Sequence, residues 1–325
     1  MALTFSRFGG ADVIEYIQMP DPILKEGEVL VEMKAIGFNF ADIYRRQGNY
    51  HLVGSPPYIA GYEGAGIIID ANNVAGYQIG DAVCFADVPM AQAEMVAVPL
   101  SHIIPLPNAI SFEAAAAILL QGLTAQYLTE DSYSISKNDQ VLIHACAGGV
   151  GQTLVQICKM KGAKVFGLTS NENKKSLAIL NGCDTVFLYH ENWVQSSKDA
   201  GITVVYESVG TTLLQSFDAV ASNGTIVFYG FAGGTPPLVD PRMLMDTSKK
   251  LVGGDLWCYL TTHDERMKRS KELFNWIQSG QIRVPTPTII PLKDGRKAHE
   301  LLESRMSTGK VILVPKKDTL HSNFC

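Results

Sequence analysis

Apolar and polar positions in the first 120 residues follow a short period that is typical of β-strands. Residues 27–33 alternate with a period of two, as a half-buried strand does. Glycine-rich turns lead into apolar segments at residues 61–69 and 80–85. Residues 41–47 predict a short helix that ends at Gly48. Many short strands separated by glycine and proline predict a barrel-like domain.

The middle of the chain has a different rhythm, in which short apolar segments alternate with helical patterns. The predicted strands lie at residues 140–144, 164–168, 185–188, 203–206 and 225–229, and the predicted helices at 148–161, 174–180 and 213–221. Strands that alternate with helices in this way indicate βαβ units and a parallel sheet wound in the right-handed sense.

The last part of the chain is too small to fold alone. It contains two helical patterns, at residues 266–278 and 291–305, and a closing strand at 311–314. We therefore expect it to complete the first domain. The predicted organisation is an α/β chain with one domain from residues 1–122 and 260–325 and a second from residues 123–259.

Composition narrows the class of protein. The 27 basic and 32 acidic side chains leave a net charge of −5, and no basic stripe is present, so nucleic acid is an unlikely partner. The six cysteines form no C-x-x-C pair, and the chain does not start like a signal peptide. The strongly apolar run at residues 114–120 is much shorter than the roughly 20 residues of a membrane helix. These features predict a cytoplasmic protein that does not bind membranes.

The most informative motif is the glycine-rich sequence at residues 146–151, between a predicted strand and a predicted helix. It fits the dinucleotide fingerprint G-x-G-x-x-G except that Cys146 takes the place of the first glycine. Glycines let the backbone approach a pyrophosphate, and the helix N-terminus offers free N–H groups. The motif predicts dinucleotide binding by Gly148, Gly149, Val150 and Gly151, although a tight turn without a ligand would have the same sequence.

The end of the second strand of this unit bears on the choice of dinucleotide. NAD sites usually place an acidic residue there to bind the ribose hydroxyls, whereas this chain has Leu168, Thr169 and Ser170. Lys174 follows, and a hydroxyl and a cation suit a 2′-phosphate, although Glu172 lies between them. We therefore favour NADP(H).

Six motifs together carry a resemblance to a known family. They are N-F-A-D-I-Y-R-R-Q-G-N-Y at 39–50, G-Y-E-G-A-G at 61–66, Q-G-L-T-A at 121–125, A-G-G-V-G at 147–151, Y-E-S-V-G at 206–210 and A-H-E-L-L-E-S-R at 298–305. In this order and spacing the chain resembles quinone oxidoreductases of the zeta-crystallin type, which are zinc-independent medium-chain dehydrogenases/reductases.

The resemblance implies a GroES-like catalytic domain, a doubly wound Rossmann domain, and an active site in the cleft. It implies Asn39 and Tyr44 beside the nicotinamide and Thr124 near the carboxamide. The other implied cofactor residues are Ser170, Lys174 and Tyr189 around the adenosine phosphate and ribose, Ser208 and Phe231 along the cofactor, and Arg305 reaching toward it. It also implies a homodimer joined at a sheet edge, near residues 225–229 or 250–255.

Zinc enzymes share this fold, so a metal site needs its own test. Where their first ligating cysteine would stand this chain has Asp42, and Tyr62 replaces the histidine of the glycine-rich turn. The closely spaced cysteines of a structural zinc lobe are missing from the first 120 residues, which contain only Cys84. We therefore expect no metal.

Without a metal to polarise an alcohol, an electrophilic acceptor that needs mainly orientation is the better substrate. We expect direct hydride transfer from NADPH to a quinone or similar conjugated carbonyl, with Tyr44 and Asn39 as the catalytic candidates that orient the ligands or donate to a developing oxyanion. Two alternatives stay open. One is an NADPH-dependent enone or alkenal double-bond reductase, and the other is a non-catalytic, crystallin-like NADPH-binding protein.

Overall fold

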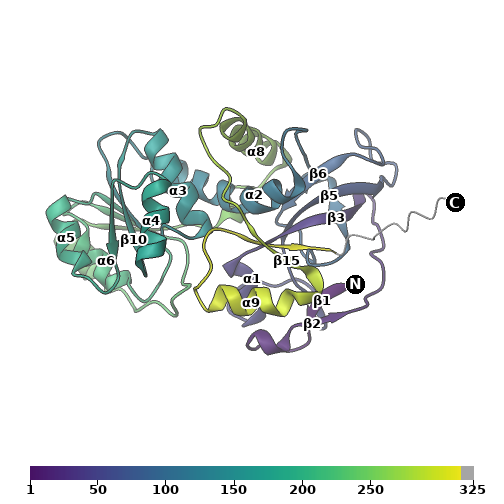
Figure 1. Cartoon of the computed structure of the whole chain (residues 1–325), viewed down its shortest axis with the longest axis horizontal. Helices are drawn as coiled ribbons and strands as arrows, with labels where there is room; N and C mark the ends of the chain where they lie inside the picture. Colours follow the sequence, from purple (N-terminus) through teal and green to yellow (C-terminus); the bar gives the residue numbers. More distant parts are fainter. Residues whose placement is uncertain (316–325) are drawn as a thin grey trace. The chain divides into compact units, whose positions relative to one another are not determined.

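The computed structural model describes residues 1–315 and divides the chain into two compact units (Figure 1). Among the described residues, unit 1 comprises Met1–Leu119 and the chain from Thr286 onward, and unit 2 comprises Leu120–Pro285. Among the described residues no helix is both long and apolar enough to cross a membrane.

Unit 1 is built mainly from antiparallel strands. Its strands are β1 (Ala2–Phe5), β2 (Glu15–Ile17), β3 (Glu28–Phe38), β4 (Tyr58–Ile59), β5 (Glu63–Asp70), β6 (Ala82–Ala86), β7 (Met95–Pro99), β8 (Ile104–Pro105), β15 (Thr288–Pro291) and β16 (Val311–Val314), and its helices are α1 (Phe40–Arg46) and α9 (Gly295–Glu303). The larger sheet has the order β15-β16-β3-β5-β6-β8, with β7 also paired to β3, and β2-β1-β4 form a small second sheet.

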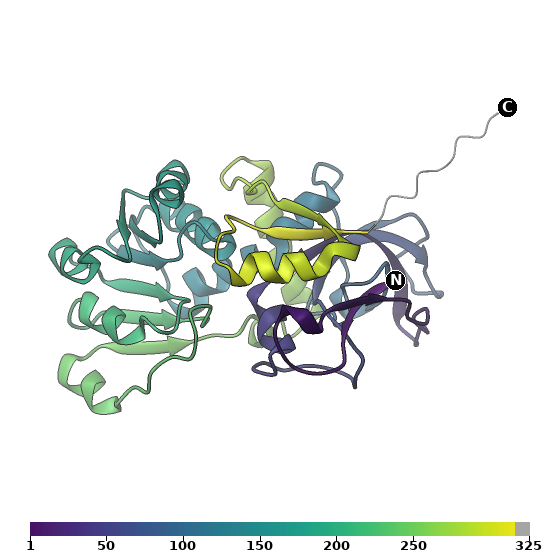
Figure 2. The same ribbon diagram turned by 60° about the horizontal axis from the view of Figure 1, so that its bottom comes forward.

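The C-terminal segment completes the sheet of unit 1, as the sequence predicts. Strand β16 pairs antiparallel with β3, so that Val311 lies opposite Phe38. Figure 2 shows helix α9, in yellow, beside the purple N-terminal segments, and α9 packs against α1. The buried apolar core of this unit joins residues from both chain segments, among them Val31, Phe85 and Leu313.

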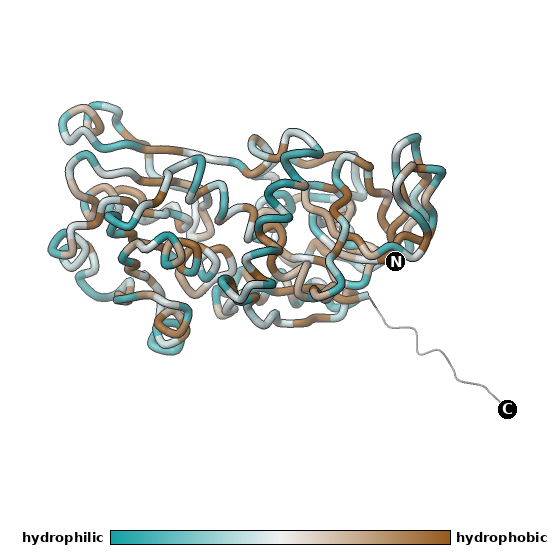
Figure 3. The backbone as a smooth tube through the Cα atoms, turned by 90° about the horizontal axis from the view of Figure 1, so that it is seen from above, coloured by the Kyte–Doolittle hydropathy of each residue, from teal (hydrophilic) through white to brown (hydrophobic). Residues whose placement is uncertain are grey.

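Unit 2 is a six-stranded parallel sheet flanked by helices, which confirms the predicted Rossmann-type fold. Its strands are β9 (Gln140–His144), β10 (Lys164–Thr169), β11 (Thr185–Leu188), β12 (Val204–Glu207), β13 (Thr225–Phe228) and β14 (Lys250–Gly253), and its helices are α3 (Gly149–Met160), α4 (Glu172–Leu180), α5 (Trp193–Ala200), α6 (Leu213–Ala219), α7 (Pro241–Thr247) and α8 (His263–Gln278), while α2 (Phe112–Tyr127) begins in unit 1 and ends in unit 2. The hydropathy colouring of Figure 3 shows apolar segments separated by polar turns, as expected where strands are buried on both faces.

The strand order β11-β10-β9-β12-β13-β14 determines where a ligand can bind. From β9 the chain winds outward to β10 and β11, and then returns to the other side of β9 with β12. Ligands of open parallel sheets bind at the carboxyl ends of the strands where the winding direction changes, which is here between β9 and β12.

Two details differ from the sequence-based expectations. Strand β13 pairs with both β12 and β14, so residues 225–229 are not a sheet edge, and β14 is the terminal strand on this side.

The compact units also group residues 260–285 with unit 2, because α8 packs against α2. There Gln126 Nε2 donates to Glu272 Oε2 at 2.6 Å, and Gly122 leaves room for Leu273. The family domain boundaries themselves stay a prediction.

Candidate functional site

The glycine-rich turn lies between β9 and α3, at the point where the sheet topology favours a ligand. Ala145 has a left-handed backbone with φ of 48°, and the Gly148 N–H closes the turn by donating to Ala145 O at 2.8 Å. The Cys146 N–H donates to Leu168 O at 3.2 Å, which joins the turn to the end of β10. Hydrogen bonds within the turn and to the end of β10 therefore fix its conformation.

The shape of this turn suits a pyrophosphate. A Cβ atom on Gly151 would lie 2.4 Å from Ala145 O, and one on Gly149 would lie 1.9 Å from Gln121 Oε1, so neither position accepts a side chain without a shift. No side chain caps the N-terminus of α3, and the first N–H groups of a helix have no partners within the helix. Gly148, Gly149 and Val150 are partly exposed. These residues fit the phosphates of a dinucleotide.

Three residues predicted to surround the adenosine lie at the carboxyl ends of β10 and β11. Ser170 is exposed directly after β10. Lys174 lies in the first turn of α4, where its N–H donates to Asn171 Oδ1 at 3.0 Å, and burial lowers the pKa of its ammonium group. The hydroxyl of Tyr189 accepts from the Ala145 N–H at 3.1 Å and is thereby connected to the glycine-rich turn itself.

A buried polar network behind the turn was not predicted from the sequence. Glu207, at the end of β12, accepts from the N–H groups of Val209 and Gly210 at 2.8 and 3.1 Å, and Ser216 Oγ donates to it at 2.6 Å. Ser216 Oγ also lies 3.0 Å from His144 Nε2. Burial alone would raise the pKa of Glu207, but His144 when protonated and the hydrogen bonds lower it. Burial lowers the pKa of His144 as well, so near neutral pH the hydrogen bonds are what keep Glu207 ionised. An ionised Glu207 therefore holds the loop that carries Ser208.

Two neighbouring loops bring Ser208 and Phe231 into the same part of unit 2. The Ala232 N–H donates to Ser208 O at 3.0 Å, and the Gly233 N–H donates to Val209 O at 2.7 Å. Both loops follow carboxyl strand ends, after β12 and β13. The structure thus groups Ser208 and Phe231 at the same end of the sheet as the glycine-rich turn.

Thr124 belongs to unit 2 but lies within helix α2. Its hydroxyl donates to Leu120 O of the same helix at 2.8 Å, and the residue is 9% exposed. The remaining lone pairs of the hydroxyl can accept a hydrogen bond.

Asn39 and Tyr44 both lie in unit 1, at the junction of β3 and α1. Asn39 precedes α1, and its N–H donates to Asp42 Oδ2 at 2.9 Å. Its side-chain Nδ2 donates to Glu63 Oε2 at 2.9 Å. Tyr44 lies in α1, about one turn after Asn39, and is partly exposed. The centre of its ring is 6.2 Å from the centre of the Phe40 ring. Both candidates therefore come from one short stretch of the chain, the junction of β3 and α1.

Arg305 lies after the C-terminal end of α9, in unit 1. The residue is exposed and has a left-handed backbone with φ of 57°, and its N–H donates to Leu302 O at 3.1 Å. The tight turn at the end of the helix thus fixes the point from which the Arg305 side chain extends.

The two residues that replace zinc ligands of related enzymes both contact Arg45. Asp42 Oδ1 lies 3.4 Å from Arg45 Nη1, and burial raises the pKa of Asp42 to about 6. The Arg45 guanidinium carbon lies 3.5 Å from the centre of the Tyr62 ring. Within residues 1–315 no group of three or more His, Cys, Asp or Glu side chains is arranged to hold a metal ion.

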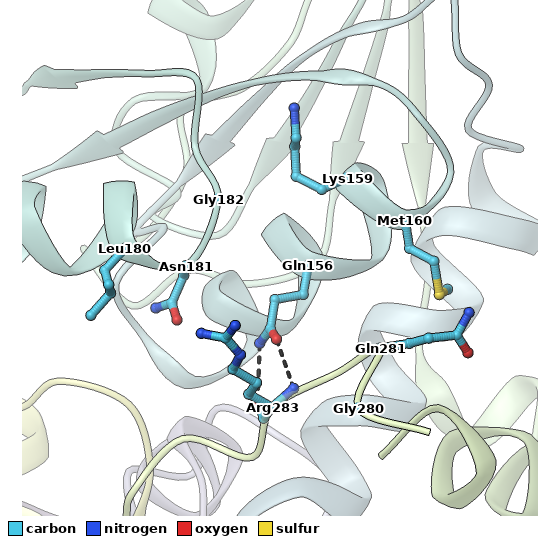
Figure 4. Close-up of a pocket in the computed structure, with 9 residues that line it drawn as sticks. All are labelled: Gln156, Lys159, Met160, Leu180, Asn181, Gly182, Gly280, Gln281 and Arg283. Carbon is cyan, nitrogen blue, oxygen red and sulfur yellow. Dashed lines mark hydrogen bonds between the residues drawn. The ribbon is translucent and has the colours of Figure 1, made fainter. Parts of the chain in front are cut away.

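A pocket of about 430 Å³ lies at the far end of α3 from the glycine-rich turn (Figure 4). The Gln156 side chain pairs with the backbone of Arg283 there, through bonds of 3.1 and 2.8 Å. None of the predicted site residues lines it; the lining residues are Gln156, Lys159, Met160, Leu180, Asn181, Gly182, Gly280, Gln281 and Arg283. The pocket is therefore separate from the candidate cofactor site.

Comparison with known proteins covers nearly the whole chain. Residues 25–137 match the alcohol dehydrogenase GroES-like domain, and residues 149–270 match the zinc-binding dehydrogenase family. The chain is 36% identical to quinone oxidoreductase 1 of Escherichia coli over 324 residues, covering 96% of this chain and 99% of the relative. It is 30% identical to 2-haloacrylate reductase of a Burkholderia species over 335 residues, covering 97% and 99% of the two chains.

A solved structure agrees with these matches. The Escherichia coli quinone oxidoreductase complexed with NADPH superposes with a TM-score of 0.92 at 36% identity, covering 97% of this chain and 99% of that one. The predicted GroES-like and Rossmann domains and the predicted family are thereby confirmed, and this chain belongs to the quinone oxidoreductase family.

Proposed function

We propose that this chain is an NADPH-dependent quinone reductase that transfers hydride directly and without zinc. The observation that carries the proposal is the glycine-rich turn at the topological switch of unit 2, with Ser170 and Lys174 in place of an acidic residue beyond β10. The relative from Escherichia coli, a quinone oxidoreductase solved with NADPH, supports both the cofactor and the acceptor.

Each unit has its own part in the proposal. In unit 2, Gly148 to Gly151 bind the pyrophosphate, Ser170, Lys174 and Tyr189 bind the 2′-phosphate and ribose, and Ser208, Phe231 and Thr124 line the rest of the cofactor. In unit 1, Asn39 and Tyr44 lie beside the nicotinamide, and Arg305 reaches toward the cofactor. The adenosine part gains affinity from the Lys174 cation, because charge-assisted hydrogen bonds to phosphate are stronger than neutral ones.

When bound, NADPH supplies the hydride. Asn39 and Tyr44 orient the acceptor and donate hydrogen bonds to the oxygen on which negative charge develops. A quinone needs little further activation, so positioning accounts for most of the rate. The phenol of Tyr44 is the group that can deliver a proton to that oxygen.

Steady-state oxidation of NADPH and NADH with an ortho-quinone, in chelator-treated protein, tests the function. We expect turnover that survives chelation and prefers NADPH. In Lys174→Met, kcat/KM for NADPH should fall ten- to a hundredfold while that for NADH stays within about twofold, because one hydrogen bond to a charged group contributes about 1.5–3 kcal/mol. The matched control is Lys175→Met, whose ammonium group lies 3.8 Å from Glu172. Loss of turnover on chelation would contradict the proposal.

A double-bond reductase is the second candidate, and the similarity to a 2-haloacrylate reductase favours it. The same site would then deliver hydride to the β-carbon of a conjugated carbonyl. Tight NADPH binding with turnover of an enone but of no quinone would replace our proposal by this one. Binding without any turnover would indicate a crystallin-like binding protein.

We further propose a cytoplasmic homodimer joined along β14. The five cysteines within the described residues are free thiols, which suits a reducing compartment. Strand β14 ends the sheet, and a terminal strand presents unpaired backbone groups that a second copy can pair.

Leu251→Lys should convert the dimer to a monomer. Leu251, on β14, is 36% exposed, and a lysine on each copy would place like charges along the paired edge. Sedimentation velocity at about 10 µM measures the oligomeric state, since a dimer of micromolar or tighter affinity is largely assembled at that concentration. The control is Leu214→Lys on α6, where the leucine is 41% exposed. A parent chain that sediments as a monomer would defeat this proposal.

A further inference from the structure

A buried cluster of three polar side chains lies in unit 1 behind the proposed nicotinamide contact Asn39. The ammonium group of Lys310 donates to Asn39 Oδ1 and to Glu63 Oε2, each at 2.7 Å. The amide nitrogen of Asn39 donates to the same Glu63 oxygen at 2.9 Å. The side chains of Lys310 and Glu63 are both fully buried. Both polar atoms of the Asn39 carboxamide are thus bound to charged groups.

Three neighbouring strands bring these residues together. Asn39 follows β3, Glu63 begins β5 and Lys310 precedes β16, and β3 pairs with both other strands. Gly37 leaves the space that the Glu63 carboxylate fills, because a Cβ there would lie 2.0 Å from Glu63 Oε2. The cluster is therefore part of the sheet itself and does not depend on a mobile loop.

The charges select one orientation of the Asn39 amide. Turning the amide over would direct its NH2 group at the Lys310 ammonium and its carbonyl oxygen at the Glu63 carboxylate, so both contacts would become repulsive. Burying an ion pair is costly and seldom stabilises a fold by itself, which leaves conformational specificity as the benefit. Here that specificity concerns a single side chain, Asn39.

We propose that Lys310 and Glu63 are positioning residues, which hold the Asn39 carboxamide in its working orientation without contacting substrate or cofactor. The inference rests on the proposed function for the role of Asn39. It assigns a task to two residues for which the sequence motifs implied no role. Misorientation of a group that aligns reactants lowers kcat by ten- to a hundredfold.

The decisive variant is the double replacement Lys310→Met with Glu63→Gln, which removes both charges and keeps the volumes. Single replacements would leave a buried unpaired charge, and the protein would then risk unfolding. We expect kcat to fall ten- to a hundredfold while the Kd for NADPH stays within about threefold. Asn39→Ala should lose a similar factor, and combining all three replacements should lose no more than Asn39→Ala alone, because residues acting as one unit are not additive.

A readout that does not depend on activity measures the orientation directly. In protein labelled with ¹⁵N at asparagine, the two Asn39 side-chain amide protons should have widely separated shifts in the parent, since one donates to a carboxylate, and converge in the double variant. The control Lys297→Met with Asp294→Asn removes an exposed ion pair of 3.0 Å in the same unit and should change neither kcat nor the Asn39 signals.

The outcomes separate the inference from the proposed function. Unchanged kcat and unchanged Asn39 signals in the double variant would overturn the inference, as would losses that multiply in the triple variant. A parent chain that oxidises no NADPH with any quinone would overturn the proposed function, while the Asn39 signals would still decide whether the pair orients the amide.

Discussion

The Gly151→Ala variant is expected to bind NADPH at least about a hundredfold more weakly than the parent, a loss of about 2.7 kcal/mol. The added Cβ would lie 2.4 Å from Ala145 O and 2.8 Å from Cys146 Cα. Both are backbone atoms of the turn, so the turn must open, and the N–H groups proposed to bind the pyrophosphate would move with it. Titration of nucleotide fluorescence measures the loss.

Two other glycines serve as graded controls. In Gly149→Ala the new Cβ would meet the end of the Gln121 side chain at 1.9 Å, and a side chain can move, so a smaller loss is expected. In Gly253→Ala, on the proposed dimer edge β14, the new Cβ meets nothing within 4 Å in the chain, and affinity for NADPH should stay within about twofold in a variant that sediments like the parent. Equal affinities for Gly151→Ala and Gly253→Ala would mean that the pyrophosphate does not bind at this turn.

Acid should destabilise unit 1 through His299 by up to about 5 kcal/mol. Burial, and secondarily the charge of Arg46, lower the pKa of His299 to about 3 from an ordinary value of 6.5. In the folded chain His299 stays neutral, and its Nδ1 accepts from Arg46 Nη1 at 3.0 Å. The unfolded chain binds the proton first, so this contribution is complete above pH 6.5 and is lost progressively as the pH falls toward 3.

Denaturant unfolding at several pH values between 7 and 4 checks this expectation. His299→Gln keeps a hydrogen-bond acceptor for Arg46 but cannot titrate, so its free energy of unfolding should fall less steeply with acid than that of the parent. The control is His190→Gln, which replaces an exposed histidine. If the free energy of unfolding of His299→Gln falls with pH as steeply as that of the parent, His299 does not cause the acid destabilisation.

Features that depend on local sequence could be predicted. The alternation of apolar strands and helices indicates the parallel sheet, and the glycines at 148–151 indicate a turn that no side chain can enter, because both signals arise within a few residues. The replacement of two zinc ligands by Asp42 and Tyr62 could be predicted for the same reason. The contact of both residues with the Arg45 guanidinium could not.

Features that depend on distant pairing could not be predicted. Glu63 and Glu207 fall within motifs that carry the family resemblance, but the motifs give neither residue a role, and Lys310 lies outside all of them. Only the strand pairing reveals that these charges are buried and bound to one another or to a loop. The sequence left residues 225–229 and 250–255 as two candidates for the terminal strand, and only the pairing of β13 on both sides selects β14. Helix α8 has an amphipathic pattern that would suit either domain. Its packing on α2 places it in unit 2.

The completion of unit 1 by the end of the chain also affects synthesis. Unit 2 is one continuous segment, so it can fold on the ribosome as soon as residue 285 has emerged. Glu63 must instead wait for Lys310, which lies 247 residues later. At about 5–20 residues per second that interval is roughly 12–50 s. During it the nascent first domain has an uncompensated acid and an unpaired β3 edge, which are features that chaperones bind and proteases exploit.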